Sequence, residues 1–115
     1  MEIFRNLIAW QKAHQLVIEI YKLVKIFPER EKFILVPQIL RAAISIAANL
    51  AEGTKRKTSK DRRHFFNIAE TSLEEVKYYI ILSTDLNYIS KNEENDLFEN
   101  AREIGRLING LIRKS

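Results

Sequence analysis

The spacing of hydrophobic residues along this chain predicts helices, because apolar positions recur at three- and four-residue steps through four separate segments. The first helix is expected from about Phe4 to Ile26, and the second from Pro37 to Gly53. Pro37 is placed at a first helical position, where its missing N–H costs no hydrogen bond. Gly53 is placed as a C-terminal cap in the left-handed conformation, which glycine adopts without steric cost.

The third and longest helix is expected to begin after Thr58 or Ser59, since either side-chain oxygen can cap free amides at a helix start. Asp61 falls in the first turn, where a negative charge is favourable. The helical period then continues for about 26 residues. Asn87 and Tyr88 are expected to interrupt it.

The fourth helix is expected to follow Ser90, because Ser90 and Glu93 have the spacing of a capping box and apolar residues then step to Leu111. Short connections between helices of similar length force neighbouring helices to reverse direction. Residues 1–115 are therefore predicted to form a single all-α domain, an antiparallel up-down-up-down four-helix bundle.

Composition supports the helical prediction and removes several classes of protein. The chain has 115 residues with three Gly, two Pro and no Cys, which leaves few turns for an all-β fold and provides no disulfide or thiolate metal ligand. No segment approaches the ~20 consecutive apolar residues of a membrane span, and the first residues do not read as a leader. We therefore expect a cytoplasmic protein without membrane contact.

The segment 37–53 is apolar around most of its circumference, which is unusual for a surface helix. Its polar residues fall on one line of the helix, called the polar stripe below: Gln38, Arg41, Ser45, Asn49 and Glu52. A helix with so little polar surface is expected to pack against a second subunit, with the polar stripe at the interface or holding the structure. The alternative is an alanine-rich helix whose small side chains are tolerated in solvent.

Positive charge is concentrated in the middle of the chain, which carries a formal net charge of +4. Six basic residues, called the basic segment below, occupy nine positions: Lys55, Arg56, Lys57, Lys60, Arg62 and Arg63. A cluster of cations at a helix N-terminus is suited to bind phosphate backbones, so these residues are candidates for nucleic-acid binding. The same residues would also serve as a solvated loop or as a patch that docks on acidic helices of a neighbouring subunit.

Residues for enzyme chemistry are few. Of the two histidines, His14 lies near the apolar seam of the first helix and is expected to be buried, and His64 is surrounded by basic residues that oppose a metal cation. The adjacent carboxylates Glu74 and Glu75 point about 100° apart on a helix and do not build an acid and base pair. The sequence therefore predicts a protein that is not an enzyme and holds no metal or cofactor.

Two stretches of the chain resemble the bacterial four-helix-bundle proteins encoded by 23S rRNA intervening sequences. The first contains Arg41-Ala42-Ala43, Ser45-Ile46, Asn49-Leu50-Ala51-Glu52-Gly53 and Arg56, and the second contains Phe65, Phe66, Ile68-Ala69, Ser72 and Glu75. Leu40, Ala47, Thr71 and Val76 depart from residues frequent in that family. The resemblance implies a bundle that assembles into a homopentameric ring, and it implies no reaction. A related pentameric bundle protein binds a reverse transcriptase and nucleic acid, which adds weight to the basic segment.

The sequence favours two functions over a third, an enzyme whose polar site lies in the bundle core or in a ring channel. The first is a non-enzymatic pentameric ring that binds RNA or another nucleic acid through the basic segment, with repeated weak contacts adding up through multivalency. The second is a protein-interaction adaptor, or an accessory subunit for a larger nucleic-acid enzyme, that makes no nucleic-acid contact itself. In the first case Arg41, Asn49 and Glu52 are expected to be structural, and Arg41→Ala is expected to weaken the oligomer.

Overall fold

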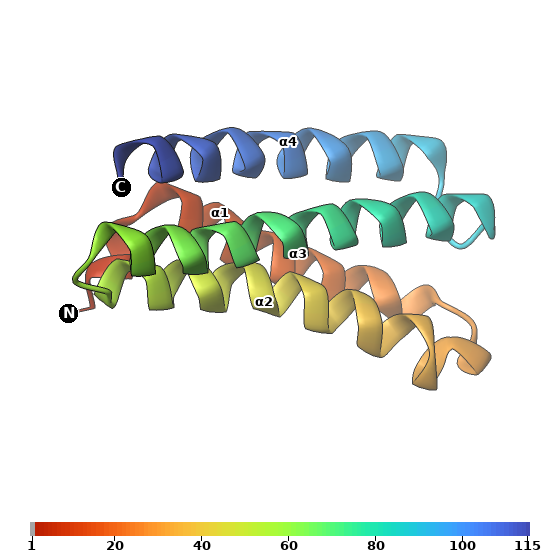
Figure 1. Ribbon diagram of the computed structural model, residues 1–115. Coiled ribbons are helices and arrows are strands. Elements are labelled where there is room, and N and C mark those ends of the chain that lie inside the picture. The colour runs from red at the N-terminus through yellow and green to blue at the C-terminus, as the bar shows by residue number, and fades with distance from the viewer. Residues whose placement is uncertain (1) are drawn as a thin grey trace.

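Four α-helices joined by short connections make up the computed structural model, which describes residues 2–115 (Figure 1). They are α1 (Ile8–Leu23), α2 (Leu35–Lys55), α3 (Ser59–Asp85) and α4 (Lys91–Lys114). Short 3-10 helices, labelled η1 to η3, cover Ile3–Asn6, Val24–Ile26 and Glu29–Phe33, and the described residues contain no strand. The all-α prediction is confirmed. The molecule is elongated, with extents of 44 × 24 × 24 Å.

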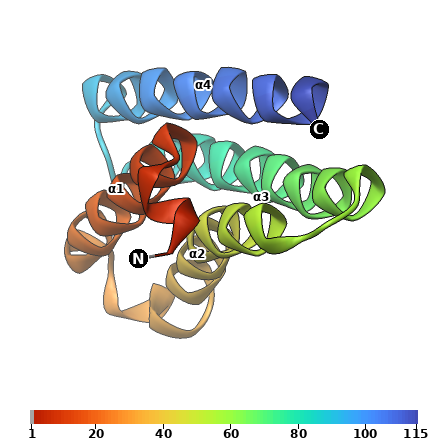
Figure 2. The ribbon, with the colours of Figure 1, turned by 90° about the vertical axis from the view of Figure 1, so that its left-hand side faces the viewer.

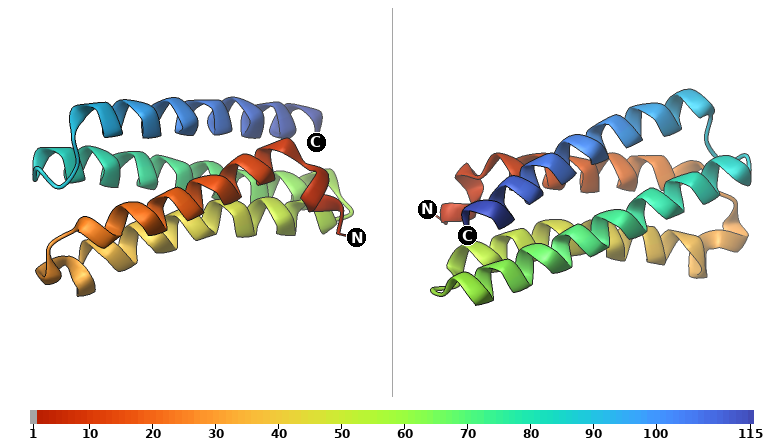
Figure 3. Two further views of the ribbon diagram at one scale, coloured as in Figure 1. Left: turned by 180° about the vertical axis from the view of Figure 1, so that it is seen from behind. Right: turned by 45° about the horizontal axis from the view of Figure 1, so that its top comes forward.

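The chain connections divide between the two ends of this elongated molecule. The α2–α3 connection lies at the same end as the beginning of η1 and the last turn of α4, whereas the α1–α2 and α3–α4 connections lie at the opposite end (Figures 1 and 3). Figure 2 looks onto the end that holds the α2–α3 connection. That end carries the basic segment.

The first predicted helix, from Phe4 to Ile26, is wrong as one continuous element. Leu7 adopts an extended conformation, with φ −80° and ψ 118°, and separates η1 from α1. The ring of Phe4 packs edge-on against Trp10 with centroids 4.9 Å apart, and Gln11 Nε2 donates a hydrogen bond of 2.7 Å to the Arg5 carbonyl. These contacts fold η1 back onto α1, so the chain must turn at Leu7.

The predicted ends of the second helix are also wrong, by two residues each. Helix α2 begins at Leu35, and Pro37 is tolerated in its first turn because backbone amides there have no partner within the helix. Gly53 lies inside α2, which continues to Lys55, and no described glycine has a positive φ. Glycine is needed at this position for space. A Cβ built on Gly53 would lie 2.5 Å from Cε1 of the buried Phe66.

The predicted starts of α3 and α4 are confirmed, because both depend on local hydrogen bonds. The Thr58 hydroxyl accepts from the Asp61 amide at 3.1 Å. Ser90 and Glu93 form the reciprocal capping box, with bonds of 3.0 and 2.8 Å. Between these helices Asn87 has a φ of 64°, the left-handed conformation that asparagine tolerates, and the chain turns there.

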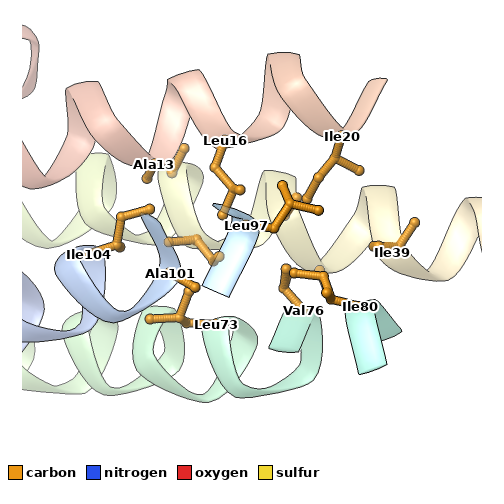
Figure 4. Packing of buried hydrophobic residues seen from close by; sticks show 14 of the residues in the cluster. Ala13, Leu16, Ile20, Ile39, Leu73, Val76, Ile80, Leu97, Ala101 and Ile104 are labelled. Carbon is orange, nitrogen blue, oxygen red and sulfur yellow. The ribbon is translucent and has the colours of Figure 1, made fainter. Parts of the chain in front are cut away.

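The core is a single cluster of apolar side chains drawn from all four helices (Figure 4). The labelled side chains converge between the helices: Ala13, Leu16, Ile20, Ile39, Leu73, Val76, Ile80, Leu97, Ala101 and Ile104. Burial of each large aliphatic side chain contributes about 1.5–3 kcal/mol to stability. This one cluster therefore holds all four helices together and fixes the positions of the connections at both ends of the molecule.

Glu31 and Tyr88 join the two connections at the end of the bundle opposite the basic segment. Tyr88 Oη donates a hydrogen bond to the carboxylate of Glu31, which is only 9% exposed. That hydrogen bond, with burial as a second cause, raises the pKa of Tyr88 above its ordinary value of 10.0. Glu31 belongs to η3 and Tyr88 to the turn after α3, so one contact ties distant parts of the chain.

Tyr88→Phe is expected to lower the stability of the fold and to change how stability depends on pH. A raised folded-state pKa means that the contribution of Tyr88 is fully present below pH 10.0 and is lost as pH rises through the folded pKa. The variant lacks this loss, so its free energy of unfolding falls less steeply above pH 10.0. Urea unfolding from neutral to alkaline pH measures both effects. Tyr78→Phe, at a side chain 58% exposed, is the control, and equal profiles for the two variants would contradict the role of Tyr88.

Candidate nucleic-acid interface

The basic segment spans the end of α2, the α2–α3 connection and the start of α3. Lys55 is the last residue of α2, Arg56 and Lys57 lie in the connection, and the other three residues occupy the first two turns of α3. The structure therefore brings all six into one region at the end of the bundle shown in Figure 2.

Arg56 and Arg62 are engaged by the protein itself. The Arg56 guanidinium pairs with Glu52 one turn earlier and lies 4.7 Å from the ring centroid of Phe65. Arg62 donates to the carbonyls of Arg56 and Lys57 at 3.3 and 3.1 Å, and to the Ser59 hydroxyl at 3.2 Å. These two arginines fix the path of the connection.

The remaining four cations point to solvent. Lys55, Lys57, Lys60 and Arg63 are all exposed, and within residues 2–115 no ion pair involves any of them. They stand beside the N-terminus of α3, whose dipole adds partial positive charge, and Asp61 contributes an opposing negative charge in the same turn. The net local charge is positive. None of these four side chains would have to give up an ion pair within the described residues in order to meet an anion.

The polar stripe of α2 separates into two groups that face different surroundings. Ser45 turns toward α3, where its hydroxyl lies 2.8 Å from that of Ser72. Asn49 Nδ2 donates to the Ser45 carbonyl and hydroxyl at 2.8 and 3.0 Å. Glu52 pairs with Arg56. These three residues therefore have partners within the chain.

Sequence reasoning missed Ser72, which is 5% exposed and completes this hydrogen-bonded group. Its position in the apolar seam of α3 gave a signal, because a serine buried in such a seam needs a hydrogen-bond partner on a facing helix. The hydroxyl of Ser45 supplies that partner.

Gln38 and Arg41 behave differently from the rest of the polar stripe. Both are exposed, and no ion pair in the described part of the chain includes Arg41. Beside them on the same outer face lie Ile44, which is 43% exposed, and Ala48, which is also exposed. The outer face of α2 thus combines an unpaired guanidinium with apolar side chains.

The prediction that His14 is buried is wrong. The His14 side chain is exposed, and its ring stacks on Trp10 with centroids 5.0 Å apart and an angle of 5° between the planes. Ala13 takes the inward position on this turn, which turns the next residue toward solvent.

Within residues 2–115, no group of three or more His, Cys, Asp or Glu side chains is placed to hold a metal ion. No helix in this part of the chain is both long enough and apolar enough to cross a membrane.

Comparisons with known proteins identify the family. The family model described as 23S rRNA-intervening sequence protein matches residues 5–110. A crystal structure of a protein of unknown function from the S23 ribosomal protein family of Bacteroides thetaiotaomicron VPI-5482 superimposes with a TM-score of 0.84. The two are 26% identical, and the match covers 91% of this chain and 98% of that chain. No curated protein matches the chain. The resemblance seen in the sequence is confirmed: this chain belongs to the 23S rRNA-intervening sequence protein family.

Proposed function

We propose that this protein is a non-enzymatic ring of five up-down-up-down bundles that binds RNA, or another nucleic acid, through its basic segment. The observation that carries the proposal is that two of the six cations have partners within the protein, whereas the other four are exposed. Arg56 and Arg62 hold the connection in place, which leaves Lys55, Lys57, Lys60 and Arg63 exposed around one helix start. Cations exposed in this way attract phosphates, and the counterions condensed on the nucleic acid are released when it binds.

The outer face of α2 supports the proposal that the bundles assemble into a ring. Ile44 and Ala48 expose apolar surface beside Arg41, and a neighbouring subunit would cover the first two and offer a partner to the third. Five copies of the basic segment on one rigid assembly would bind a long polyanion with an avidity that one copy lacks. Weak individual contacts are therefore sufficient.

The triple variant K55Q/K57Q/K60Q tests the proposal. Each lost phosphate contact reduces the magnitude of the slope of log affinity against log salt by about 0.7–0.9. For the triple variant the magnitude of this slope is therefore expected to fall by about 2, and the affinity at about 0.1 M salt to fall about a hundredfold. Fluorescence anisotropy of a labelled single-stranded RNA, titrated over a range of salt, measures both quantities.

The matched control is K22Q/K25Q/K32Q, which removes the same charge with the same substitutions at the opposite end of the bundle. Equal losses in the two variants would show a general charge effect and contradict a site at the basic segment. Wild-type protein that binds no RNA would contradict the proposed function itself.

An adaptor for another protein is the alternative function, and a different surface favours it. Ile26, Phe33 and Ile34 lie in or beside the α1–α2 connection and are 63%, 84% and 66% exposed. Exposed apolar side chains grouped in this way are typical of protein-binding surfaces. If the protein is an adaptor of this kind, the wild-type protein is expected to purify free of nucleic acid and not to bind the RNA probe.

A further inference from the structure

The end of the bundle that holds the basic segment also holds the last turn of α4. Arg62 Nη2 lies 3.5 Å from the Ser115 carbonyl, which joins the first turns of α3 to the residue that follows α4. Figures 1 and 3 show the α2–α3 connection and the end of α4 together in views from opposite sides. Residues more than 40 positions apart in sequence therefore border one surface.

Charge along α4 is strongly polarised toward this surface. The stretch 91–100 contains four Asp or Glu and one Lys, whereas the stretch 101–115 contains four Lys or Arg and one Glu. The single acidic residue of the second stretch, Glu103, is paired with Lys12 at 3.1 Å. The basic residues near the end of α4 therefore face little opposing charge on their own helix.

Three of these basic residues are available to a ligand. Arg106, Arg113 and Lys114 are exposed, and none takes part in an ion pair among the residues that the structure describes. Arg106 and Lys114 also line the same cleft of about 350 Å³, between the start of α1 and the end of α4. Arg102 lies apart, because its guanidinium is 5.2 Å from the ring centroid of Phe98.

We infer that Arg106, Arg113 and Lys114 form a second phosphate-binding group, and that an RNA strand crosses the end of the bundle from the basic segment to α4. This inference rests on the proposed function and extends its site to a second element. Packed helices lie about 8–10 Å apart, a distance that about two or three successive phosphates of a strand span. The acidic start of α4 repels RNA at the far end and orients the strand toward this one.

The variant R106Q/R113Q/K114Q tests the second group by the same anisotropy titration with the labelled single-stranded RNA. Affinity at about 0.1 M salt is expected to fall about a hundredfold, and the salt slope to fall by about 2. The control K22Q/K25Q/K32Q removes an equal charge at the other end of the bundle and is expected to leave the slope unchanged. Basic residues in a last helical turn also stabilise the helix, so thermal unfolding of each variant must show that the fold is retained. If R106Q/R113Q/K114Q does not fold, the single variants R106Q, R113Q and K114Q take its place, each expected to lower the slope by about 0.7–0.9.

The outcomes separate this inference from the function on which it rests. If K55Q/K57Q/K60Q weakens binding and the α4 variant matches the far-end control, the second group does not exist and the proposed function stands. If both variants lower the slope and the control does not, the strand contacts both elements. If the wild-type protein binds no RNA, the second group is overturned together with the proposed function.

Discussion

Gly53→Ala is expected to lower the free energy of unfolding by about 1–3 kcal/mol, although alanine favours a helix over glycine by up to about 1 kcal/mol. The added methyl group would lie 2.5, 2.8 and 3.2 Å from Cε1, Cδ1 and Cζ of Phe66. Phe66 is 3% exposed, so its ring has no solvent to move into. The clash must therefore displace the Phe66 ring within the core or move α2 away from α3 beside the basic segment. Thermal or urea unfolding measures the loss.

Gly110→Ala is the matched control, since it makes the same change inside another helix. Its Cβ would meet only the end of the Arg113 side chain, at 3.9 Å. This variant is expected to gain up to about 1 kcal/mol from helix propensity alone. In the double variant G53A/F66L the smaller side chain relieves the clash, so the two costs are expected to be less than additive. Equal stabilities for G53A and G110A would disprove the close packing at Gly53.

Features set by neighbours in sequence could be predicted from the sequence. The Thr58 cap and the Ser90 capping box depend on residues within one turn, and both occur where the pattern placed them. The periodicity of apolar residues likewise predicted four helices, because the inward face of each helix repeats along its own sequence.

Features set by contacts between helices could not be predicted in this way. Gly53 has a sequence context typical of a helix end, and only the approach of Phe66 shows why glycine occurs there. Leu7 interrupts a regular apolar pattern because Phe4 packs back on Trp10. His14 is exposed because α1 turns the preceding residue, Ala13, toward the core. The apolar periodicity predicted which face of α1 is buried only to within one residue, and one residue is about 100° of rotation.

The candidate site shows the same limit in its charges. Counting charges in the sequence treats the six cations of the basic segment alike, but in the structure Arg56 and Arg62 have partners, while the other four are exposed and form no ion pair among residues 2–115. Sequence also gave no reason to join the end of α4 to this segment, since the two are brought together only by the path of the chain through the bundle. The sequence therefore shows where basic residues are concentrated, and the fold determines which of these side chains a ligand can reach.

The outer face of α2 leaves Arg41 and Ile44 exposed, and no ion pair among residues 2–115 includes Arg41. Three other residues of the polar stripe, Ser45, Asn49 and Glu52, bond within the chain. Ile44 lies between these groups with 43% of its surface exposed. An exposed isoleucine beside an unpaired arginine is suited to a subunit interface, where burial of the first and pairing of the second stabilise the assembly together.

Ile44→Glu is expected to convert the proposed ring into single chains. Light scattering coupled to size-exclusion chromatography should give five times the chain mass of 13.5 kDa for the wild-type protein and one chain mass for the variant. The reason is that the charged side chain loses its hydration at the interface and removes the apolar contact of Ile44, while any pair it forms with Arg41 takes that guanidinium from the neighbouring subunit. Arg41→Ala, which removes charge and leaves the apolar contact, is expected to dissociate only on dilution. Ile18→Glu is the matched control, because Ile18 on α1 is also 43% exposed and is expected to remain in solvent. A wild-type protein of one chain mass, or equal dissociation of I18E and I44E, would contradict an interface on α2.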